Sequence, residues 1–396
     1  MKLQYKKILI YLFLFTAIYS TSMYMMEEVS GNIQLALLFS SAFLIWLLNT
    51  KINKRTMIFS TIMIVLIIVS ILANGIDNFL DIQVIVTIVS SFLICNGLKK
   101  KQFMENYCNI ILFLAIISLV CFVLYRVAPG IYDFFPTNLW RYGSTRFVNL
   151  FFVVIPVGMS DYFRNFGIFY EPGIFQIYLN IALFYELFRE NIKFKRVLLI
   201  LITIITTMST NGYITAILII AVYGYNILGK RDVSKKVKYL YLATIIIGFI
   251  IMIIMVSSGY IGERVFTKFT ETRDSGSTFD RLNAIVYAIE KYISSPVLGV
   301  GFAGYSDAYN ATCTSLNWFA LYGTFFGILM NVSFIKFFSI MGKDIFTKIL
   351  IVLVILTLLI SQEMTTNCIV WCIAIYGSLQ FILKPRGIKK EAKNEY

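Results

Sequence analysis

The chain has 396 residues, of which 59% are hydrophobic and only 14% are charged, and its formal net charge is +14. Apolar runs long enough to cross a bilayer recur from end to end, which excludes a soluble globular domain and predicts an all-α, polytopic membrane protein. The chain contains no histidine, which removes the commonest general base and the commonest transition-metal ligand.

In chain order, the apolar runs predict about twelve membrane-spanning helices in a single multi-pass domain that covers residues 1–396. The runs lie near residues 8–26, 33–49, 57–74, 82–98, 107–125, 170–188, 195–209, 212–229, 238–257, 316–335, 348–362 and 366–383. The first run follows three lysines, as in a signal peptide, but no small-residue cleavage site follows it, and we expect it to remain as the first helix. Five of the six cysteines lie within apolar runs and predict neither a disulfide framework nor a metal site.

The basic residues predict the orientation of these helices. If the N-terminus is cytoplasmic, the inner loops and termini hold 26 of the 35 Lys and Arg residues, as the positive-inside rule requires. Both termini are then cytoplasmic, and two large loops, 127–169 and 258–315, lie outside. The net charge follows from lysines beside helix ends, where anionic lipid lies, so we predict no nucleic-acid partner.

The nine basic residues left on the outer side are mostly arginines. They include Arg126, Arg141, Arg146, Arg164, Arg264, Arg273 and Arg281. A guanidinium group makes bidentate hydrogen bonds to phosphate oxygens and stays charged in poorly hydrated sites. The excess of arginine over lysine therefore favours an anion site at the outer face. The alternative is that these arginines pair with carboxylates of the same loops.

The first outer loop leads into the sixth predicted helix. Its 13-residue apolar run, 148–160, is too short to span comfortably, which favours a re-entrant or interfacial segment. Proline suits the first turn of a helix, so Pro172 predicts that Glu171 lies at the helix N-terminus. A carboxylate at a membrane boundary is a functional candidate, and the alternative is a simple helix cap paired with Arg164.

Two further polar segments are predicted to lie outside. A tight turn, Ser209 to Gly212, separates the seventh and eighth helices, and as turn chemistry alone it needs no function. If it faces an outer cavity, its hydroxyl and N–H groups would also meet a ligand. The long stretch from Tyr260 to Asn317 contains an Arg-rich helical pattern that Pro296 ends, followed by Gly299 and Gly301, which favours a compact functional loop.

These segments resemble the O-antigen polymerase and ligase superfamily of bacterial surface-polysaccharide assembly. The likeness rests on the run from Arg164 to Pro172 entering a helix, on the Ser209-Thr210-x-Gly212 turn, and on Arg281 followed by Pro296-x-Leu298-Gly299-x-Gly301. It covers residues 160 to about 325 and the general topology. It implies a GT-C-like membrane glycosyltransferase whose large outer loop holds part of the active site. The ligase branch is expected to have a histidine in that loop, so this chain resembles the polymerase branch.

The resemblance implies a reaction at the outer face of the bacterial cytoplasmic membrane. The donor would be an oligosaccharide on undecaprenyl diphosphate, and the acceptor a hydroxyl of another lipid-linked unit of O-antigen (lipopolysaccharide) or capsule. Arg281 and Arg164 would clamp the diphosphate, and Glu171 would deprotonate or orient the acceptor. Further substrate contacts are predicted at Arg141, Arg146, Arg264, Arg273, Ser209, Thr210, Asn211, Gly299, Gly301, Asn310 and Asn317.

No cofactor or metal is expected, because the chain has no Asp-x-Asp pair of the kind that holds a divalent ion on a sugar diphosphate. The expected partners are membrane lipid, a chain-length regulator and a flippase. A lipid-linked oligosaccharide flippase is also the main rival function, but it would carry cationic residues inside its spans. A secondary transporter and an acyltransferase are further rivals, and an acyltransferase would be expected to show a histidine.

Overall fold

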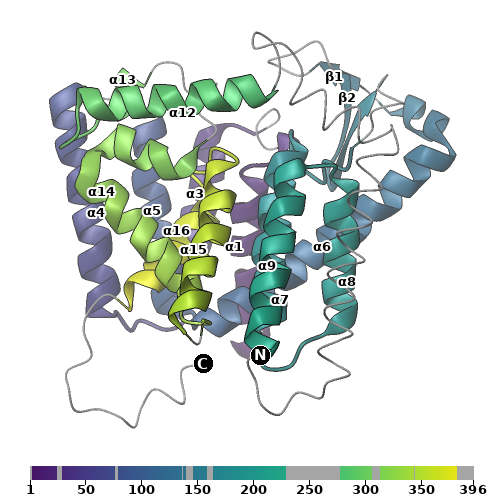
Figure 1. The fold of residues 1–396 in the computed structure, drawn as a ribbon, viewed down its shortest axis with the longest axis horizontal. Coiled ribbons are helices and arrows are strands. Elements are labelled where there is room, and N and C mark those ends of the chain that lie inside the picture. The colour runs from purple at the N-terminus through teal and green to yellow at the C-terminus, as the bar shows by residue number, and fades with distance from the viewer. Residues whose placement is uncertain are drawn as a thin grey trace.

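The computed structural model describes residues 2–24, 29–75, 79–135, 137–139, 146–157, 164–228, 277–305, 313–342 and 344–380. The described chain is mostly helical, with one small β-sheet (Figure 1). The helices are α1 (Lys2–Tyr19), α3 (Gly31–Leu47), α4 (Lys54–Asn74), α5 (Leu80–Gly97), α6 (Lys100–Val127), the 3-10 helix η1 (Pro129–Phe134), α7 (Pro172–Phe188), α8 (Phe194–Thr206), α9 (Thr210–Leu228), α12 (Ser277–Ser294), α13 (Gly301–Gly304), α14 (Thr314–Ser339), α15 (Ile345–Ile360) and α16 (Cys368–Ser378).

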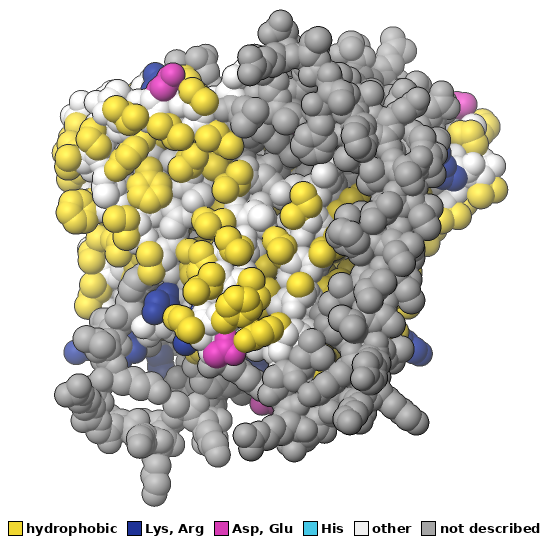
Figure 2. Space-filling view, viewed as in Figure 1, with side chains coloured by type: hydrophobic (Ala, Val, Ile, Leu, Met, Phe, Trp, Pro, Cys, Tyr) yellow, Lys and Arg dark blue, Asp and Glu magenta, His cyan; other side chains and the backbone are white. Residues whose placement is uncertain are grey.

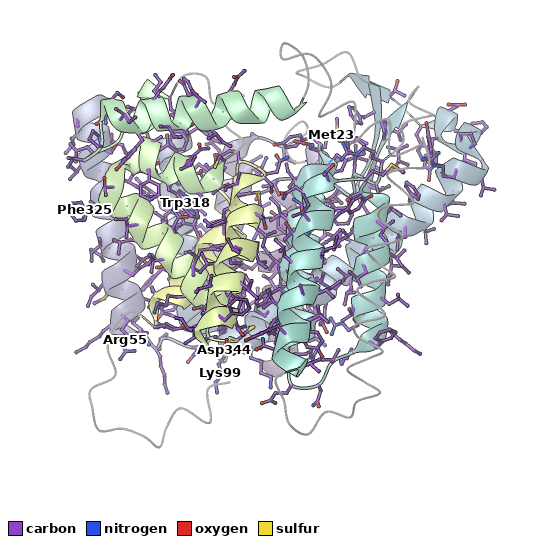
Figure 3. The ribbon with its side chains drawn as sticks, viewed as in Figure 1. Met23, Arg55, Lys99, Trp318, Phe325 and Asp344 are labelled. Carbon is purple, nitrogen blue, oxygen red and sulfur yellow. The ribbon has the colours of Figure 1, made fainter. Side chains whose placement is uncertain are left out.

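The bundle has two ends with different contents. Helix α1 starts at one end, where Arg55, Lys99 and Asp344 also lie, and we call it the terminal end (Figure 3). Arg55 Nη1 donates to the carbonyl of Leu379 at 3.0 Å, which brings the end of α16 to the same place. The sheet and helix α12 lie at the opposite end, near Met23, and we call it the sheet end.

Four of the described helices are long and apolar enough to cross a membrane, namely α4, α5, α6 and α14. Helices α3, α15 and α16 are apolar but shorter. Figure 2 shows apolar side chains spread over the face between the two ends, while most visible charged side chains lie near the ends. The described chain is thus a largely helical protein with helices of membrane-spanning length, as the sequence predicts. The predicted span 238–257 lies outside the described residues.

A small sheet contains the described part of the apolar run 148–160, and residues 158–160 lie outside the described residues. Its strands β1 (Thr137–Leu139), β2 (Arg146–Leu150) and β3 (Val153–Val157) pair antiparallel in the order β1-β2-β3. Alternate residues along the strands point to opposite faces of the sheet and pack into two clusters. Val148, Val153 and Ile155 pack against tyrosines near the end of α6. Phe147 and Val154 pack against Met23. The all-α prediction therefore misses this sheet.

Helices α7 and α16 form the centre of the bundle. All residues from Pro172 to Leu187 in α7 are buried, and so is every residue of α16. Burial on all sides means that other parts of the protein surround both helices. The residues that precede these two helices are thereby held in fixed positions at the sheet end.

Helix α14 is kinked at Gly323, where φ is 81°. The kink lets residues 296–300 pack against the helix backbone, since Thr324 N donates to Pro296 O at 2.9 Å and Val300 N donates to Ala320 O at 2.8 Å. A Cβ at Gly323 would overlap the carbonyl of Val297. Glycine is required here for both its positive φ and its missing side chain.

We expect Gly323→Ala to lower the free energy of unfolding by about 3 kcal/mol, because a positive φ costs about 1–2 kcal/mol and overpacking about 1–3 kcal/mol. Gly75→Ala is the matched control, since Gly75 has a φ of 90° but no atom within 4 Å of an added Cβ. It should cost only about 1–2 kcal/mol. Thermal unfolding of the purified variants in detergent measures both changes, and equal losses would contradict the packing argument.

Candidate functional site

Four segments that are far apart in the sequence meet at the sheet end. They are residues 164–171 before α7, 207–211 around the start of α9, 313–317 at the start of α14, and 361–367 between α15 and α16. Hydrogen bonds join them in pairs, and Thr314, for example, donates from N at 3.3 Å and from Oγ1 at 2.5 Å to the carbonyl of Gln362. The polar residues of the predicted outer loops are thus concentrated at one end of the bundle.

Glu171 occupies the N-cap position of α7, as the sequence predicts. Its backbone is extended (φ −141°, ψ 133°), and its carbonyl accepts from Ile174 N at 3.1 Å. The side chain makes no capping hydrogen bond. The Oε1 atom of Glu171 lies beside Gly173, and a Cβ added to Gly173 would be 3.0 Å from this oxygen. The position is therefore that of a cap, but the carboxylate does not satisfy the N–H groups of the first turn.

The amide of Gln362 lies in the same place. A Cβ added to Gly173 would overlap Gln362 Nε2. The Gln362 amide and the Glu171 carboxylate therefore both approach the start of α7, where the missing side chain of Gly173 leaves room. Gln362 is buried, and its Nε2 has no hydrogen-bond partner among the described residues. A buried amide N–H without a partner is costly, which makes it a candidate donor to a bound ligand.

Arg164 lies at the start of the segment that leads to Glu171. Its Nε donates to the carbonyl of Thr207 at 3.0 Å, at the end of α8. The neighbouring Asn165 donates from Nδ2 to Ser118 Oγ at 3.1 Å and to Thr206 Oγ1 at 2.9 Å. These bonds fix the backbone at Arg164 against α6 and α8.

A second carboxylate, Glu363, belongs to the site, and the sequence analysis did not single it out. Asn317 donates from Nδ2 to Glu363 Oε2, and Thr365 N donates to Oε1 at 2.6 Å. Tyr305 in turn donates its hydroxyl to Asn317 Oδ1 at 2.9 Å. Burial raises the pKa of Glu363, so this carboxyl holds a proton at a higher pH than an exposed glutamate does.

The two carboxylates act on one common neighbour, Tyr170. Burial raises the pKa of Tyr170, and the negative charges of Glu171 and Glu363 raise it further. Glu171 follows Tyr170 in the chain, and Glu363 follows Gln362, whose amide approaches the start of α7 beside Glu171. We call Glu171 and Glu363 the carboxylate pair.

A sequence signal for Glu363 exists, although it is short. Residues 361–367 read Ser-Gln-Glu-Met-Thr-Thr-Asn and separate two apolar runs, and Glu363 is the one acidic residue between Asp344 and Glu391. An ionisable residue between two spans is a functional candidate. This signal is weak beside the arginines of the long loops, because one glutamate in a seven-residue loop forms no pattern with other residues.

Several predicted substrate contacts hold helices together. Ser209 Oγ accepts from Gly212 N at 3.4 Å, Thr210 begins α9, and Asn211 donates from Nδ2 to Thr357 O at 3.1 Å. Gly299 and Gly301 have positive φ angles of 70° and 64° and are buried where residues 296–301 meet α14 and α4. Asn74 Nδ2 donates to Gly299 O at 3.0 Å. Contact of these residues with substrate stays a prediction.

Other predicted site residues are described in part or not at all. Arg141, Arg264, Arg273 and Asn310 lie outside the described residues. For Arg146 and Arg281 the structure describes the backbone, in β2 and in α12, and not the side chain. Helix α12 runs across the sheet end (Figure 1), and its Tyr287 ring packs 5.1 Å from the ring of Tyr305. Arg281 precedes Tyr287 by six positions, about 9 Å along the helix.

Comparisons with protein-family models, with curated proteins and with solved structures found no match.

A carboxylate pair with a buried amide, a tyrosine and helix N-termini nearby suits proton transfer and the binding of an anion. Within the described part of the chain, no cluster of three or more His, Cys, Asp or Glu residues has the geometry of a metal site. The groups at hand for chemistry are thus carboxylates, amides, hydroxyls and the guanidinium of Arg164.

Proposed function

We propose that the protein is a lipid-linked polysaccharide polymerase of the bacterial cytoplasmic membrane. It would join undecaprenyl-diphosphate-linked repeat units of O-antigen or capsule by glycosyl transfer at the outer face. The observation that carries this proposal is the carboxylate pair, Glu171 and Glu363, at the same end of the bundle as Arg164 and helix α12. Such a site combines a candidate base with groups that favour a diphosphate.

The distribution of basic residues supports an outward-facing site. Basic residues gather where helices begin or end at the terminal end: Lys6, Lys7, Lys51, Lys54, Arg55, Lys99, Lys100, Lys101, Arg189, Lys193, Lys195, Arg196, Lys336 and Lys348. By the positive-inside rule this end is cytoplasmic, and the sheet end is then outside. Lipid-linked repeat units presented at the outer leaflet would reach the carboxylate pair there.

The same distribution disfavours a flippase. In the described helices that run between the two ends, Lys and Arg occur in the first or last two turns and not in the middle. A transporter of an anionic lipid-linked glycan would need cations along the translocation path inside the membrane. The ligase alternative is disfavoured by the absence of histidine from the sequence.

The reaction we propose is an attack of an acceptor sugar hydroxyl on the anomeric carbon of the donor. The new glycosidic bond forms as the bond to the diphosphate oxygen breaks, and the hydroxyl proton passes to the Glu171 carboxylate and then to solvent. Undecaprenyl diphosphate leaves with the electron pair, and guanidinium groups and helix N–H groups stabilise its charge. Glu363 would keep Asn317 and residues 361–367 in position beside Glu171.

The proposal is tested with purified protein and lipid-linked repeat units in detergent, where no translocation is needed. We expect a ladder of longer glycans and release of undecaprenyl diphosphate, without added metal and in the presence of a chelator. A flippase would make no ladder. Unchanged repeat units after prolonged incubation, with protein that is folded and binds the donor, would contradict the proposal.

A further inference from the structure

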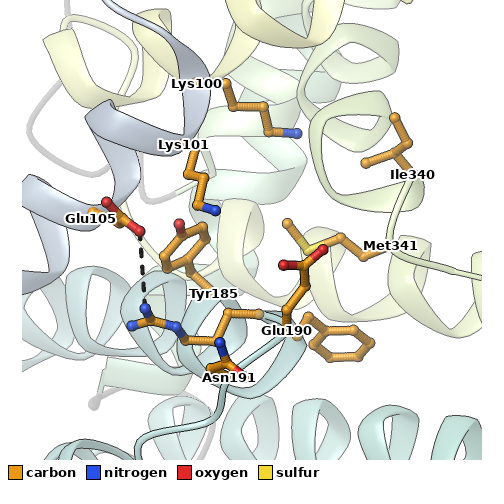
Figure 4. Close-up of a pocket in the computed structure, with 10 residues that line it drawn as sticks. Lys100, Lys101, Glu105, Tyr185, Glu190, Asn191, Ile340 and Met341 are labelled. Carbon is orange, nitrogen blue, oxygen red and sulfur yellow. Dashed lines mark ion pairs between the residues drawn. The ribbon is translucent and has the colours of Figure 1, made fainter. Parts of the chain in front are cut away.

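A cavity of about 410 Å³ lies at the terminal end, opposite the carboxylate pair. Its walls are the first turns of α6, the end of α7 with the residues after it, and the end of α14 (Figure 4). The charged residues that line it are Lys100, Lys101, Glu105, Arg189 and Glu190. The proposed glycosyl transfer uses none of them, so the cavity needs an explanation of its own.

Two of the cations already have protein partners. Arg189 pairs with Glu186 at 3.1 Å and with Glu105 at 3.9 Å. Lys100 Nζ donates to Phe337 O at 2.8 Å and lies 3.9 Å from the centre of the Phe337 ring. These contacts fix both cations at the wall of the cavity. The bond to Phe337 O uses one N–H group of Lys100, and the rest of the amino group can bind a ligand.

Lys101 is exposed and has no ion pair among the described residues. Figure 4 shows the amino groups of Lys100 and Lys101 and the carboxylate of Glu190 turned toward the same space. Helix α6 also begins here, and its N-cap residue Lys99 makes no side-chain capping hydrogen bond. The first-turn N–H groups and the two ammonium groups together favour an anion in the cavity.

Part of the remaining wall is apolar, and the cavity lies where two helices of membrane-spanning length begin or end. Phe188, Ile340 and Met341 line it beside the charged residues. Helices α6 and α14, whose ends form the cavity, are two of the four helices long and apolar enough to cross a membrane. A ligand with a phosphate next to hydrocarbon matches cations next to an apolar wall.

We propose that this cavity binds the phosphate of a membrane glycerophospholipid, held by Lys101 and Lys100 at the start of α6. The glycerol and the first acyl carbons would contact Phe188, Ile340 and Met341. Glu190 faces the same space and limits the affinity for a headgroup with a full negative charge. The site is separate from the proposed polymerase site and does not depend on that function.

Native mass spectrometry of the purified full chain with added phosphatidylglycerol tests the proposal. Lys101→Ala should retain the lipid about 10- to 100-fold less well, because it removes a charge-assisted hydrogen bond to the phosphate. Glu190→Gln should retain it better than the unmodified chain. Lys51→Ala removes an exposed lysine at the same end, away from the cavity, and should change nothing.

Two results would overturn the proposal. One is equal retention of phosphatidylglycerol by the unmodified chain and by both Lys101→Ala and Glu190→Gln. The other is a loss of inorganic phosphate binding in Lys101→Ala with no loss of lipid binding. That result would assign the cavity to a soluble phosphate compound. Because Lys101 is exposed and makes no ion pair in the described structure, Lys101→Ala should fold normally, and its melting temperature in detergent checks this.

Discussion

Glu171→Gln should reduce the rate of polymerisation by about 10²–10⁴-fold while donor binding stays unchanged, a range typical of losing a general base. Glutamine keeps the shape of the side chain but cannot accept the proton of the acceptor hydroxyl. The structure sharpens this expectation, because the carboxylate makes no capping hydrogen bond that glutamine would have to replace. Initial rates of ladder formation and donor binding, measured on the same purified protein, separate the two effects.

Two further carboxylate variants act as controls for Glu171→Gln. Glu290→Gln changes an exposed carboxylate on α12 and should leave both the rate and the donor affinity unchanged. Glu363→Gln tests the second carboxylate of the pair. If Glu363→Gln lost the activity and Glu171→Gln kept it, the base would be Glu363. Near-normal ladders from Glu171→Gln would give Glu171 a structural role only.

Arg281→Ala and Arg164→Ala should each abolish polymer formation while the protein still inserts and accumulates. Each substitution would remove charge-assisted hydrogen bonds to the departing diphosphate. Arg281→Lys should restore activity only in part, because a point charge does not reproduce bidentate geometry. The readout is the length distribution of glycans made by purified variants, with protein amount as the normalisation.

The arginine test needs a structural control at Arg164. Its Nε donates to Thr207 O, so Arg164→Ala also removes a bond between the segment before α7 and the end of α8. Thr207→Ala cannot remove this bond by itself, because the acceptor is the backbone carbonyl of Thr207. The melting temperature of Arg164→Ala is therefore measured alongside its activity. Arg126→Ala, at the end of α6, should leave the ladders intact. Normal ladders from both Arg164→Ala and Arg281→Ala would refute the clamp.

The start of α7 illustrates what a local pattern predicts well. Within a helix, proline is favoured in the first turn, and the structure begins α7 at Pro172, with Glu171 as the N-cap. The turn before α9 is predicted less well, because α9 begins at Thr210 and includes Asn211 and Gly212, which the sequence predicts to lie in the turn. The start of α7 depends on a few neighbouring residues, so the sequence is sufficient to predict it.

Residues 148–157 show what a local pattern misses. The apolar run predicts a re-entrant or interfacial segment of an all-α protein, and the structure forms two strands of a sheet there, at the end of the bundle. Strand pairing depends on β1 and on the tyrosines and Met23 that the strands cover, and these lie elsewhere in the chain. Gly299 is a similar case. The sequence predicts it as a substrate contact, whereas the structure packs it so closely against the backbone of Leu321 in α14 that a side chain would overlap it.

The sequence by itself determined the membrane class, the ends of several helices and the gathering of basic residues on one side, because each follows from composition or from neighbouring residues. Only the tertiary structure brought Glu363 to Tyr170 and Glu171, and formed the cavity beside Lys100 and Lys101. Both sites join loops and helix ends that are far apart in the chain. Their geometry depends on how buried helices such as α7 and α16 pack, and packing energy is a property of the whole assembly of helices rather than of any one segment.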